Sequence, residues 1–366
     1  MQLPSGKTTE RHTTMEPIDE QTDISRRGIL RSAAGITALG ALPMIASASD
    51  VPKTIRPKRM KSGDTFGLIA PASATGDENQ IQTVIARMEA LGFKVKQAKN
   101  LREKYGYLAG TDNQRAEDFN AMVRDPEVDG ILCYHGGYGT MRMLPQIDYN
   151  AFKNNPKVVV GYSDITGLLM ALNAKTGVIG FHGPVGNSTW SIFDTEWFKK
   201  AAFTAAPIGT FGSRDQEMDP LPETLVEGVG EGRLLGGNLT LISHLIGTPY
   251  FPDPHGAIWC LEDIGEDPYK VDRMLTHMWL AGAFKGAQGI VFGSVRPRAA
   301  DPARTPSQND FSMIEVLRDR TKRFGLPSYS GFSFGHIENQ VTVPIGVRAR
   351  IDAAARTLRV LEPAVK

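Results

Sequence analysis

The chain of 366 residues is predicted to be an α/β protein with a mostly parallel sheet that carries helices on both faces. Three observations predict this class. Short apolar, β-branched runs alternate with segments whose apolar residues recur at helical spacing. Gly- and Pro-containing turns separate the segments. Hydrophobic residues make up 41% of the chain and charged residues 22%, as in ordinary globular proteins, and the length suffices for two domains.

The elements follow one another from residue 65 onward. A strand is expected where an apolar run stands between turn residues, and a helix where a capping residue precedes apolar residues spaced by three or four and Gly or Pro ends the pattern. In the first half we expect strands at 65–70, 93–97, 130–134 and 158–160, and helices at 80–91, 112–124 and after Ser163. In the second half we expect strands at 257–262 and 289–292, helices at 268–280 and 312–324, and a closing hairpin of 343–351 with 357–361.

Residues 1–48 are interpreted as an export signal to be excluded from the fold. The segment from Ser25 to Arg31, S-R-R-G-I-L-R, resembles the twin-arginine signal, and an apolar segment and an A-x-A cleavage site at Ala48 follow it. The apolar segment is too short to remain as a membrane-spanning helix, so no stable membrane anchor is expected, although an uncleaved anchor stays open. The mature protein would start near Ser49, after export by the twin-arginine (Tat) machinery, and would be periplasmic or extracytoplasmic.

The mature chain is predicted to have two domains. Residues 56–199 would form the N-terminal α/β domain and residues 229–366 the C-terminal domain. Residues 200–228 are rich in Pro, Gly, Thr and acidic residues without a sustained period, so they are interpreted as the linker.

Charge and cysteine content exclude several classes of partner. The formal net charge is +1, so no large field attracts nucleic acid or an anionic membrane. The two cysteines, Cys133 and Cys260, lie in apolar strand-like runs without metal-ligand spacing. We expect buried free thiols and no metal or other cofactor; a disulfide in an oxidising compartment stays open.

Ser163 is the first candidate for a catalytic residue. It stands between the apolar run Val158–Val160 and the next helical segment, so its hydroxyl would project from the carboxyl edge of the sheet, where open α/β folds bind their ligands. The backbone N–H of Asp164 at the helix start would be free to stabilise an oxyanion. A helix cap is the alternative role for Ser163.

The sequence G-G-Y-G follows another expected strand. It lacks the spacing of a dinucleotide site or a P-loop. Gly136 and Gly137 would let a ligand approach the backbone closely and would offer N–H groups to an oxyanion; a plain tight turn is the alternative.

Glu262 and His336 complete the chemistry that a serine nucleophile needs. Glu262 ends an apolar strand, where a carboxylate is costly unless it is paired or functional. His336 lies in a Gly-flanked loop before the last strands, and imidazole titrates near neutral pH, as a general base should; an ordinary surface histidine is the alternative. With Ser163 they would supply nucleophile, base and orienting carboxylate. No H-E-x-x-H pair is present, so a zinc hydrolase is not indicated.

Together these residues resemble the serine LD-carboxypeptidase family, the muramoyltetrapeptide carboxypeptidases, with microcin-immunity peptidases as relatives. The shared motifs run through nearly the whole mature chain. They are G-D-T-F-G-L-I-A-P-A-S (63–73), G-G-Y-G (136–139), G-Y-S-D-I-T (161–166), F-H-G-P (181–184), G-G-N-L (236–239), L-E-D-I-G-E-D-P-Y-K-V-D-R-M-L (261–275) and F-G-H (334–336).

The resemblance implies roles, a fold and partners. Ser163 would be the nucleophile, Glu262 the orienting acid and His336 the general base. The N-terminal domain would be flavodoxin-like and related to glutamine amidotransferases, the C-terminal domain would be β-rich, and the active site would lie in the cleft between them. The family also implies homodimers. Two features depart from the family: the export signal, and His135 at the position of the usual Arg before G-G-Y-G.

The function expected is therefore that of a serine carboxypeptidase that hydrolyses an L,D peptide bond and releases a terminal D-amino acid, D-Ala, from a murein tetrapeptide in cell-wall turnover. Three alternatives stay open. They are a microcin-immunity-like peptidase or amidase, an α/β-hydrolase-type esterase, and a non-catalytic protein that binds murein fragments. The esterase is disfavoured because the sequence around Ser163 lacks the second Gly of G-x-S-x-G.

Overall fold

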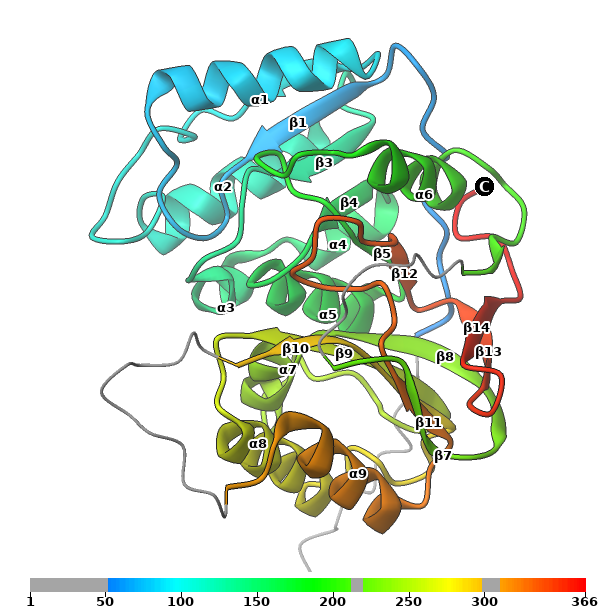
Figure 1. Cartoon of the computed structure of the whole chain (residues 1–366). Coiled ribbons are helices and arrows are strands. Elements are labelled where there is room, and N and C mark those ends of the chain that lie inside the picture. Colours follow the sequence, from blue (N-terminus) through cyan, green and yellow to red (C-terminus); the bar gives the residue numbers. More distant parts are fainter. Residues whose placement is uncertain (1–51, 212–219, 298–309) are drawn as a thin grey trace, which may run out of the picture. The chain divides into compact units, whose positions relative to one another are not determined.

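The computed structural model describes residues 52–211, 220–297 and 310–366 (Figure 1). The predicted signal, 1–48, lies outside the described residues. The described residues belong to one compact unit, and they form two sheets.

The first sheet has six strands in the order β12-β5-β4-β3-β1-β2. Its strands are β1 (Thr65–Ile69), β2 (Lys94–Gln97), β3 (Gly130–Cys133), β4 (Val158–Gly161), β5 (Gly180–His182) and β12 (Val343–Ile345). The neighbours β2, β1, β3, β4 and β5 are parallel, and their order is that of flavodoxin-like sheets. The expected α/β class and the flavodoxin-like relation are therefore confirmed.

Helices connect these strands. They are α1 (Glu78–Ala90), α2 (Asp112–Arg124), α3 (Thr140–Met143), the 3-10 turn η1 (Leu144–Gln146), α4 (Tyr149–Asn154), α5 (Ile165–Thr176) and α6 (Ile192–Ala202). Most residues of α5 are buried, because this helix contacts β4 and β5 on one side and β8 and α7 of the second half on the other. This two-sided burial explains why its sequence is apolar around most of its circumference.

The second sheet is mixed, with the order β6-β14-β13-β8-β9-β10-β11-β7. Its strands are β6 (Gly209–Thr210), β7 (Glu223–Val226), β8 (Val229–Asn238), β9 (Ala257–Ile264), β10 (Gly289–Arg296), β11 (Ser328–Ser330), β13 (Arg348–Asp352) and β14 (Thr357–Val360). The central strands β8 to β11 are parallel. Figure 1 shows the helices of this half, α7 (Leu239–Leu245), α8 (Pro268–Leu280) and α9 (Met313–Phe324), side by side, and they contact one another in that order.

The expected closing hairpin is wrong for its first arm. Residues 343–345 form β12, which pairs antiparallel with β5 of the first sheet, and the part of the expected hairpin that pairs with β14 is β13 alone. Gly346, with φ of 105°, turns the chain between the two sheets. The division into domains at 200–228 stays a prediction; β6 and β7 lie inside that range as strands of the second sheet, and 212–219 are outside the described residues.

Candidate active site

Ser163 lies in the turn between β4 and α5, as the sequence predicted. Its backbone has φ of 62°, a left-handed conformation that is uncommon for a residue with a side chain. Such a conformation costs about 1–3 kcal/mol and persists where the surroundings enforce it. Here the buried strand β4 and the buried helix α5 fix both ends of the turn. The strained turn therefore holds the hydroxyl in one place.

The structure brings Ser163, His336 and Glu262 together from three separate segments. The Ser163 Oγ lies 3.0 Å from Nε2 of His336, and Nδ1 of His336 lies 2.7 Å from Oε2 of Glu262. Because the carboxylate can only accept, Nδ1–H donates to Glu262 and leaves Nε2 as acceptor for the serine hydroxyl. The side chain of Glu262 is fully buried, and that of His336 is 15% exposed.

The environment favours an ionised Glu262 and a readily protonated His336. Burial alone would raise the pKa of Glu262, but the neighbouring His336, through charge and hydrogen bond, holds this pKa below its ordinary value. Burial likewise opposes the charged form of His336, yet the charge of Glu262 and the hydrogen bond to it raise the pKa of His336 above 6.5. The pair therefore stabilises the imidazolium that forms when the histidine takes a proton.

One aromatic ring packs against the imidazole of His336, and a second histidine lies buried nearby. Tyr162 meets the ring of His336 at 4.9 Å between centroids in an edge-to-face arrangement. His182 at the end of β5 is fully buried, and its ring lies 4.4 Å from that of Phe334. Burial lowers the pKa of His182 to about 4, so this second histidine is neutral at neutral pH and adds no positive charge beside Glu262.

Two of the three predicted oxyanion donors, Gly136 and Asp164, lie beside Ser163, and the third, Gly137, follows Gly136 in the same loop. A Cβ atom placed on Gly136 would lie 2.9 Å from the Cβ of Ser163 and 3.3 Å from the backbone N of Asp164. The N–H groups of Gly136, Gly137 and Asp164 make no hydrogen bond to another group in the part of the chain that the structure describes. They are therefore available to a negative oxygen that forms beside Ser163.

His135, which directly precedes the G-G-Y-G loop, contacts the loop after β1. Its Nε2–H donates to the carbonyl oxygen of Ala74 at 3.0 Å. The side chain is half-buried. It thus joins the loop after β3 to the loop after β1.

Sequence reasoning missed several residues that hold the site. The Oγ of Ser73 accepts from the N–H of Tyr138 at 2.9 Å, and Thr140 donates twice to Asp164. A fully buried Arg115 contacts the same loops. Arg115 had a detectable signal, since it shares a helical stripe with the buried Phe119 and Met122.

Neither cysteine nor a metal ligand set adds to this chemistry. Cys133 and Cys260 are buried free thiols, and burial raises the pKa of both, which keeps them protonated. Within 52–211, 220–297 and 310–366 there is no group of three or more His, Cys, Asp or Glu side chains placed to hold a metal ion. The same ranges contain no helix with the length and apolar character of a membrane span.

The fold and the site together define a class, an α/β protein with the groups of a serine-type hydrolase: a hydroxyl beside an imidazole, a buried carboxylate behind it, and backbone donors around the hydroxyl.

Comparison with protein families identifies the member of this class. The model of the LD-carboxypeptidase N-terminal domain matches residues 66–183, and that of the LD-carboxypeptidase C-terminal domain matches residues 231–351. The chain belongs to the LD-carboxypeptidase family and is a serine-type carboxypeptidase.

Individual relatives agree with this assignment. A Bacillus subtilis protein named a probable murein peptide carboxypeptidase is 38% identical over 305 residues, which are 82% of this chain and 93% of that protein. The murein tetrapeptide carboxypeptidase of Pseudomonas aeruginosa is 33% identical over 220 residues, 57% of this chain and 69% of that protein.

Solved structures show the same fold. The muramoyltetrapeptide carboxypeptidase from Oxalobacter formigenes superposes with a TM-score of 0.70 at 28% identity, covering 82% of this chain and 99% of that one. The microcin C7 self-immunity protein MccF superposes with a TM-score of 0.76 at 24% identity, covering 85% and 99%, and at that identity it informs on the fold alone.

Proposed function

We propose that the protein is a metal-independent serine LD-carboxypeptidase that removes the terminal D-alanine from a murein tetrapeptide. The hydrogen-bonded chain from Ser163 through His336 to Glu262 is the observation that carries this proposal. The names of the Bacillus and Pseudomonas relatives support murein peptide as the substrate class. Family membership supports the L,D bond as the bond that is cleaved.

The mechanism follows from the geometry. Ser163 Oγ attacks the carbonyl carbon of the L,D peptide bond while Nε2 of His336 takes its proton. The resulting oxyanion accepts hydrogen bonds from the N–H groups of Asp164 and of Gly136 or Gly137. His336 then gives the proton to the leaving amine of the D-amino acid. A water molecule, deprotonated by the same nitrogen, hydrolyses the acyl-enzyme, and the proton returns to Ser163.

Glu262 has the third role. Its hydrogen bond to Nδ1 keeps the proton off Nε2 in the resting state and stabilises the imidazolium during both steps. A protein that only bound murein fragments would not need this buried carboxylate behind a histidine, because burying a charge is costly unless it is used or paired. Turnover is therefore favoured over binding alone.

The test is turnover of the tetrapeptide L-Ala-D-Glu-diaminopimelate-D-Ala, followed by mass spectrometry. We expect release of one alanine, unaffected by EDTA, and loss of several orders of magnitude in kcat for Ser163→Ala and for His336→Ala. The double variant should lose little more, because the two residues act as a unit. Glu262→Gln should lose less than either, because nucleophile and base remain.

Circular dichroism controls for folding in each variant. A folded Ser163→Ala protein that keeps a tenth of wild-type activity, a barrier change of only about 1.4 kcal/mol, would exclude Ser163 as the nucleophile. Cleavage of an aminoacyl sulfamoyl nucleoside, but of no murein peptide, would instead favour an immunity-type peptidase.

Export through the twin-arginine pathway is part of the same proposal, supported by Arg26, Arg27 and the A-x-A site at Ala48. Replacing both arginines with lysine should leave the full-length protein in the cytoplasm, as fractionation and immunoblotting would detect. Wild-type protein that stays uncleaved in the cytoplasm would contradict export.

A further inference from the structure

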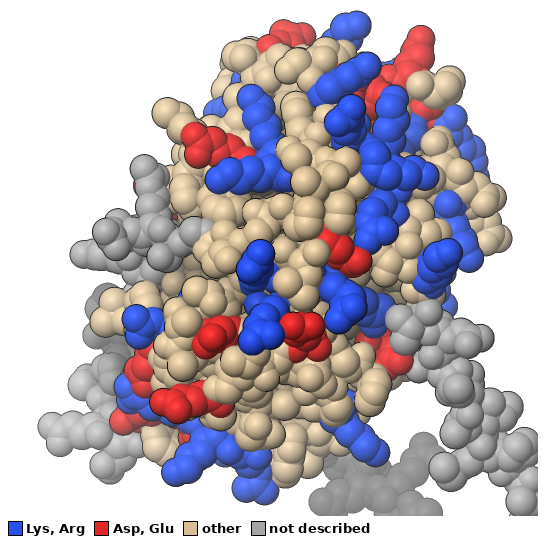
Figure 2. Space-filling model, turned by 90° about the vertical axis from the view of Figure 1, so that its right-hand side faces the viewer, with Lys and Arg blue, Asp and Glu red and all other residues tan. Residues whose placement is uncertain are grey.

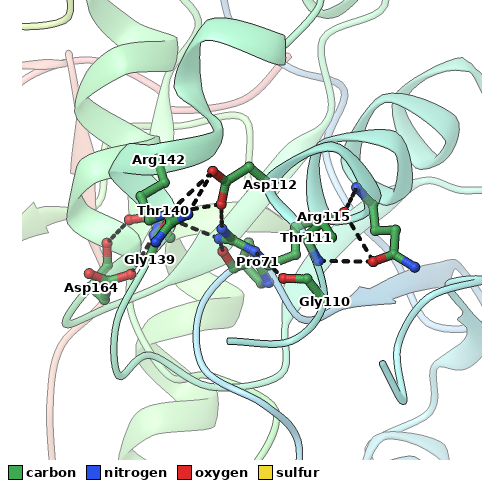
Figure 3. A network of polar contacts seen from close by, with 10 residues as sticks. Pro71, Gly110, Thr111, Asp112, Arg115, Gly139, Thr140, Arg142 and Asp164 are labelled. Carbon is green, nitrogen blue, oxygen red and sulfur yellow. Dashed lines mark hydrogen bonds and ion pairs between the residues drawn. The ribbon is translucent and has the colours of Figure 1, made fainter. Parts of the chain in front are cut away.

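A buried arginine joins the loops around the proposed oxyanion donors. Arg115 lies in α2, and none of its side chain is exposed. Its Nη1 donates to the carbonyl oxygens of Pro71, at 2.6 Å, and Gly139, at 2.8 Å, and Nη2 donates to Asp112 (Figure 3). One guanidinium therefore holds two loops that follow different strands.

These two loops also hold each other. Pro71 belongs to the loop after β1, and Gly139 ends the G-G-Y-G loop after β3. Ser73, two residues beyond Pro71, accepts at its Oγ from the N–H of Tyr138 at 2.9 Å. Gly136 and Gly137 lie in the loop that is fixed by these contacts.

The same network reaches the turn that carries Ser163. The N–H of Thr140 donates to a carboxylate oxygen of Asp164 at 2.8 Å, and the Thr140 hydroxyl donates to the Asp164 backbone oxygen at 2.5 Å. Figure 3 shows this continuous path from Asp112 through Arg115, Gly139 and Thr140 to Asp164. All of the proposed oxyanion donors are thus attached to one rigid polar network.

Arginine suits this position better than any other residue. Its planar guanidinium donates in several directions at fixed angles, whereas the ammonium of lysine is a compact point charge on a flexible stem. The approach is close, because a Cβ on Gly139 would lie 3.1 Å from Nη1 of Arg115 and 2.4 Å from Leu108. Asp112, which also pairs with the more exposed Arg142, neutralises the buried charge.

We propose that Arg115 is a positioning residue that sets the geometry of the oxyanion donors through the carbonyls of Pro71 and Gly139. It touches no substrate, and it acts on the rate because donors displaced by about 1 Å lose about 10²-fold of their effect. The inference rests on the proposed function of Ser163 and its neighbouring N–H groups.

The test measures the rate at which a small alkyl fluorophosphonate modifies Ser163, read by intact-protein mass spectrometry. In this reaction Ser163 Oγ attacks phosphorus, its proton passes to Nε2 of His336, fluoride leaves, and the P=O oxygen occupies the oxyanion position, so no murein peptide is needed. For Arg115→Lys we expect about 10²-fold slower labelling and an equal loss in kcat on the tetrapeptide, with KM within about twofold. The matched control is Arg124→Lys, also in α2 but exposed and paired with Asp148, which should label at the wild-type rate.

If Arg115→Lys does not fold, Thr140→Val tests the same network. Thr140→Val removes only the hydroxyl that bonds to Asp164, and it should slow labelling by about tenfold, with Thr140→Ser restoring the rate. Wild-type labelling rates in folded Arg115→Lys, or in Thr140→Val where Arg115→Lys is unfolded, would overturn the inference, as would a change confined to KM. Wild-type protein that is labelled but releases no alanine would instead refute the proposed substrate and leave the Arg115 result interpretable.

Discussion

At the scale of the residue, the space beside Ser163 is tightly filled. Gly136 does not have a positive φ, so its backbone could accept alanine, but an added Cβ would lie 2.9 Å from the Cβ of Ser163 and 3.2 Å from its Oγ. Since real Cβ contacts are not that short, Ser163 or the loop would have to move.

Gly136→Ala should therefore reduce kcat by about 10²-fold while the melting temperature changes little, because the crowded atoms belong to the site and not to the core. Gly106→Ala is the opposite control. Gly106 has φ of 61° and no atom within 4 Å of an added Cβ, so it should lose about 1 kcal/mol of stability and keep its activity. Steady-state kinetics and thermal unfolding of both variants check the contrast; wild-type kcat in Gly136→Ala would contradict it.

The pH dependence of the rate should report on the charge pair. His336 must be neutral to accept a proton, and its pKa is raised above 6.5, with Glu262 as the raising cause. Activity should therefore increase with pH through a midpoint above 6.5. Glu262→Gln removes the charge, so the midpoint of its residual activity should move to lower pH. The profile of kcat/KM against pH measures both; a midpoint that moves upward would contradict the assignment.

Motifs predicted the proposed catalytic residues, but not the residues that position them. Ser163, Glu262 and His336 each stand at a strand end or in a Gly-flanked loop, and the structure brings them together as expected. The contacts of Ser73 and Arg115 join segments far apart in the sequence, so periodicity gives no partner for them.

At the scale of the element, long periodic segments were predictable and short ones were not. The helix expected at 112–124 is α2 with the same bounds. The short helices α3 and α4 were not predicted, since one or two turns carry too little pattern. The longer helix α6 was also missed. β12 was misassigned because its residues continue within three positions into the alternating strand β13, and only tertiary pairing separates the two strands.

Gly346 lies between β12 and β13, where the chain passes from the first sheet to the second. Its φ is 105°, and its N–H donates to the carbonyl oxygen of Leu234 at 2.7 Å. An added Cβ would lie 2.4 Å from the side-chain nitrogen Nδ2 of Asn173 in α5. Gly346→Ala combines backbone strain with a buried clash, so it should lose about 2–3 kcal/mol in urea unfolding. A loss under about 0.5 kcal/mol would show that β12 and β13 can be joined without this turn.

At the scale of the whole molecule, net charge hides an uneven distribution. The formal value is +1, yet Lys and Arg side chains gather on the face shown in Figure 2. Some arginines of the molecule are paired: Arg348 and Arg350 of β13 both pair with Glu231 of β8, and Arg56 pairs with Glu362. Exposed pairs of this kind contribute at most about 1 kcal/mol each, so the stability of the molecule depends on its buried surfaces.

Buried contacts join the two segments that the family models match. Strand β12, from the second domain match, completes the first sheet, and α5, from the first domain match, contacts β8. The chain ends add to this, because Lys366 exchanges backbone hydrogen bonds with Pro57 and Arg59. Each half, taken alone, would therefore expose surface that the other half buries in the intact chain.

The chain from residue 52 onward should consequently unfold in one cooperative transition. A piece such as 56–199 would lose β12, leaving β5 as an edge strand paired only with β4, and would expose the face of α5 that packs on β8 and α7. Urea unfolding followed by both tryptophan fluorescence and circular dichroism should give coincident curves, and calorimetry should give equal calorimetric and van't Hoff enthalpies. Two separated transitions, with the first assigned by proteolysis to either half, would show that the halves are independently stable and that the shared strand β12 contributes little to their coupling.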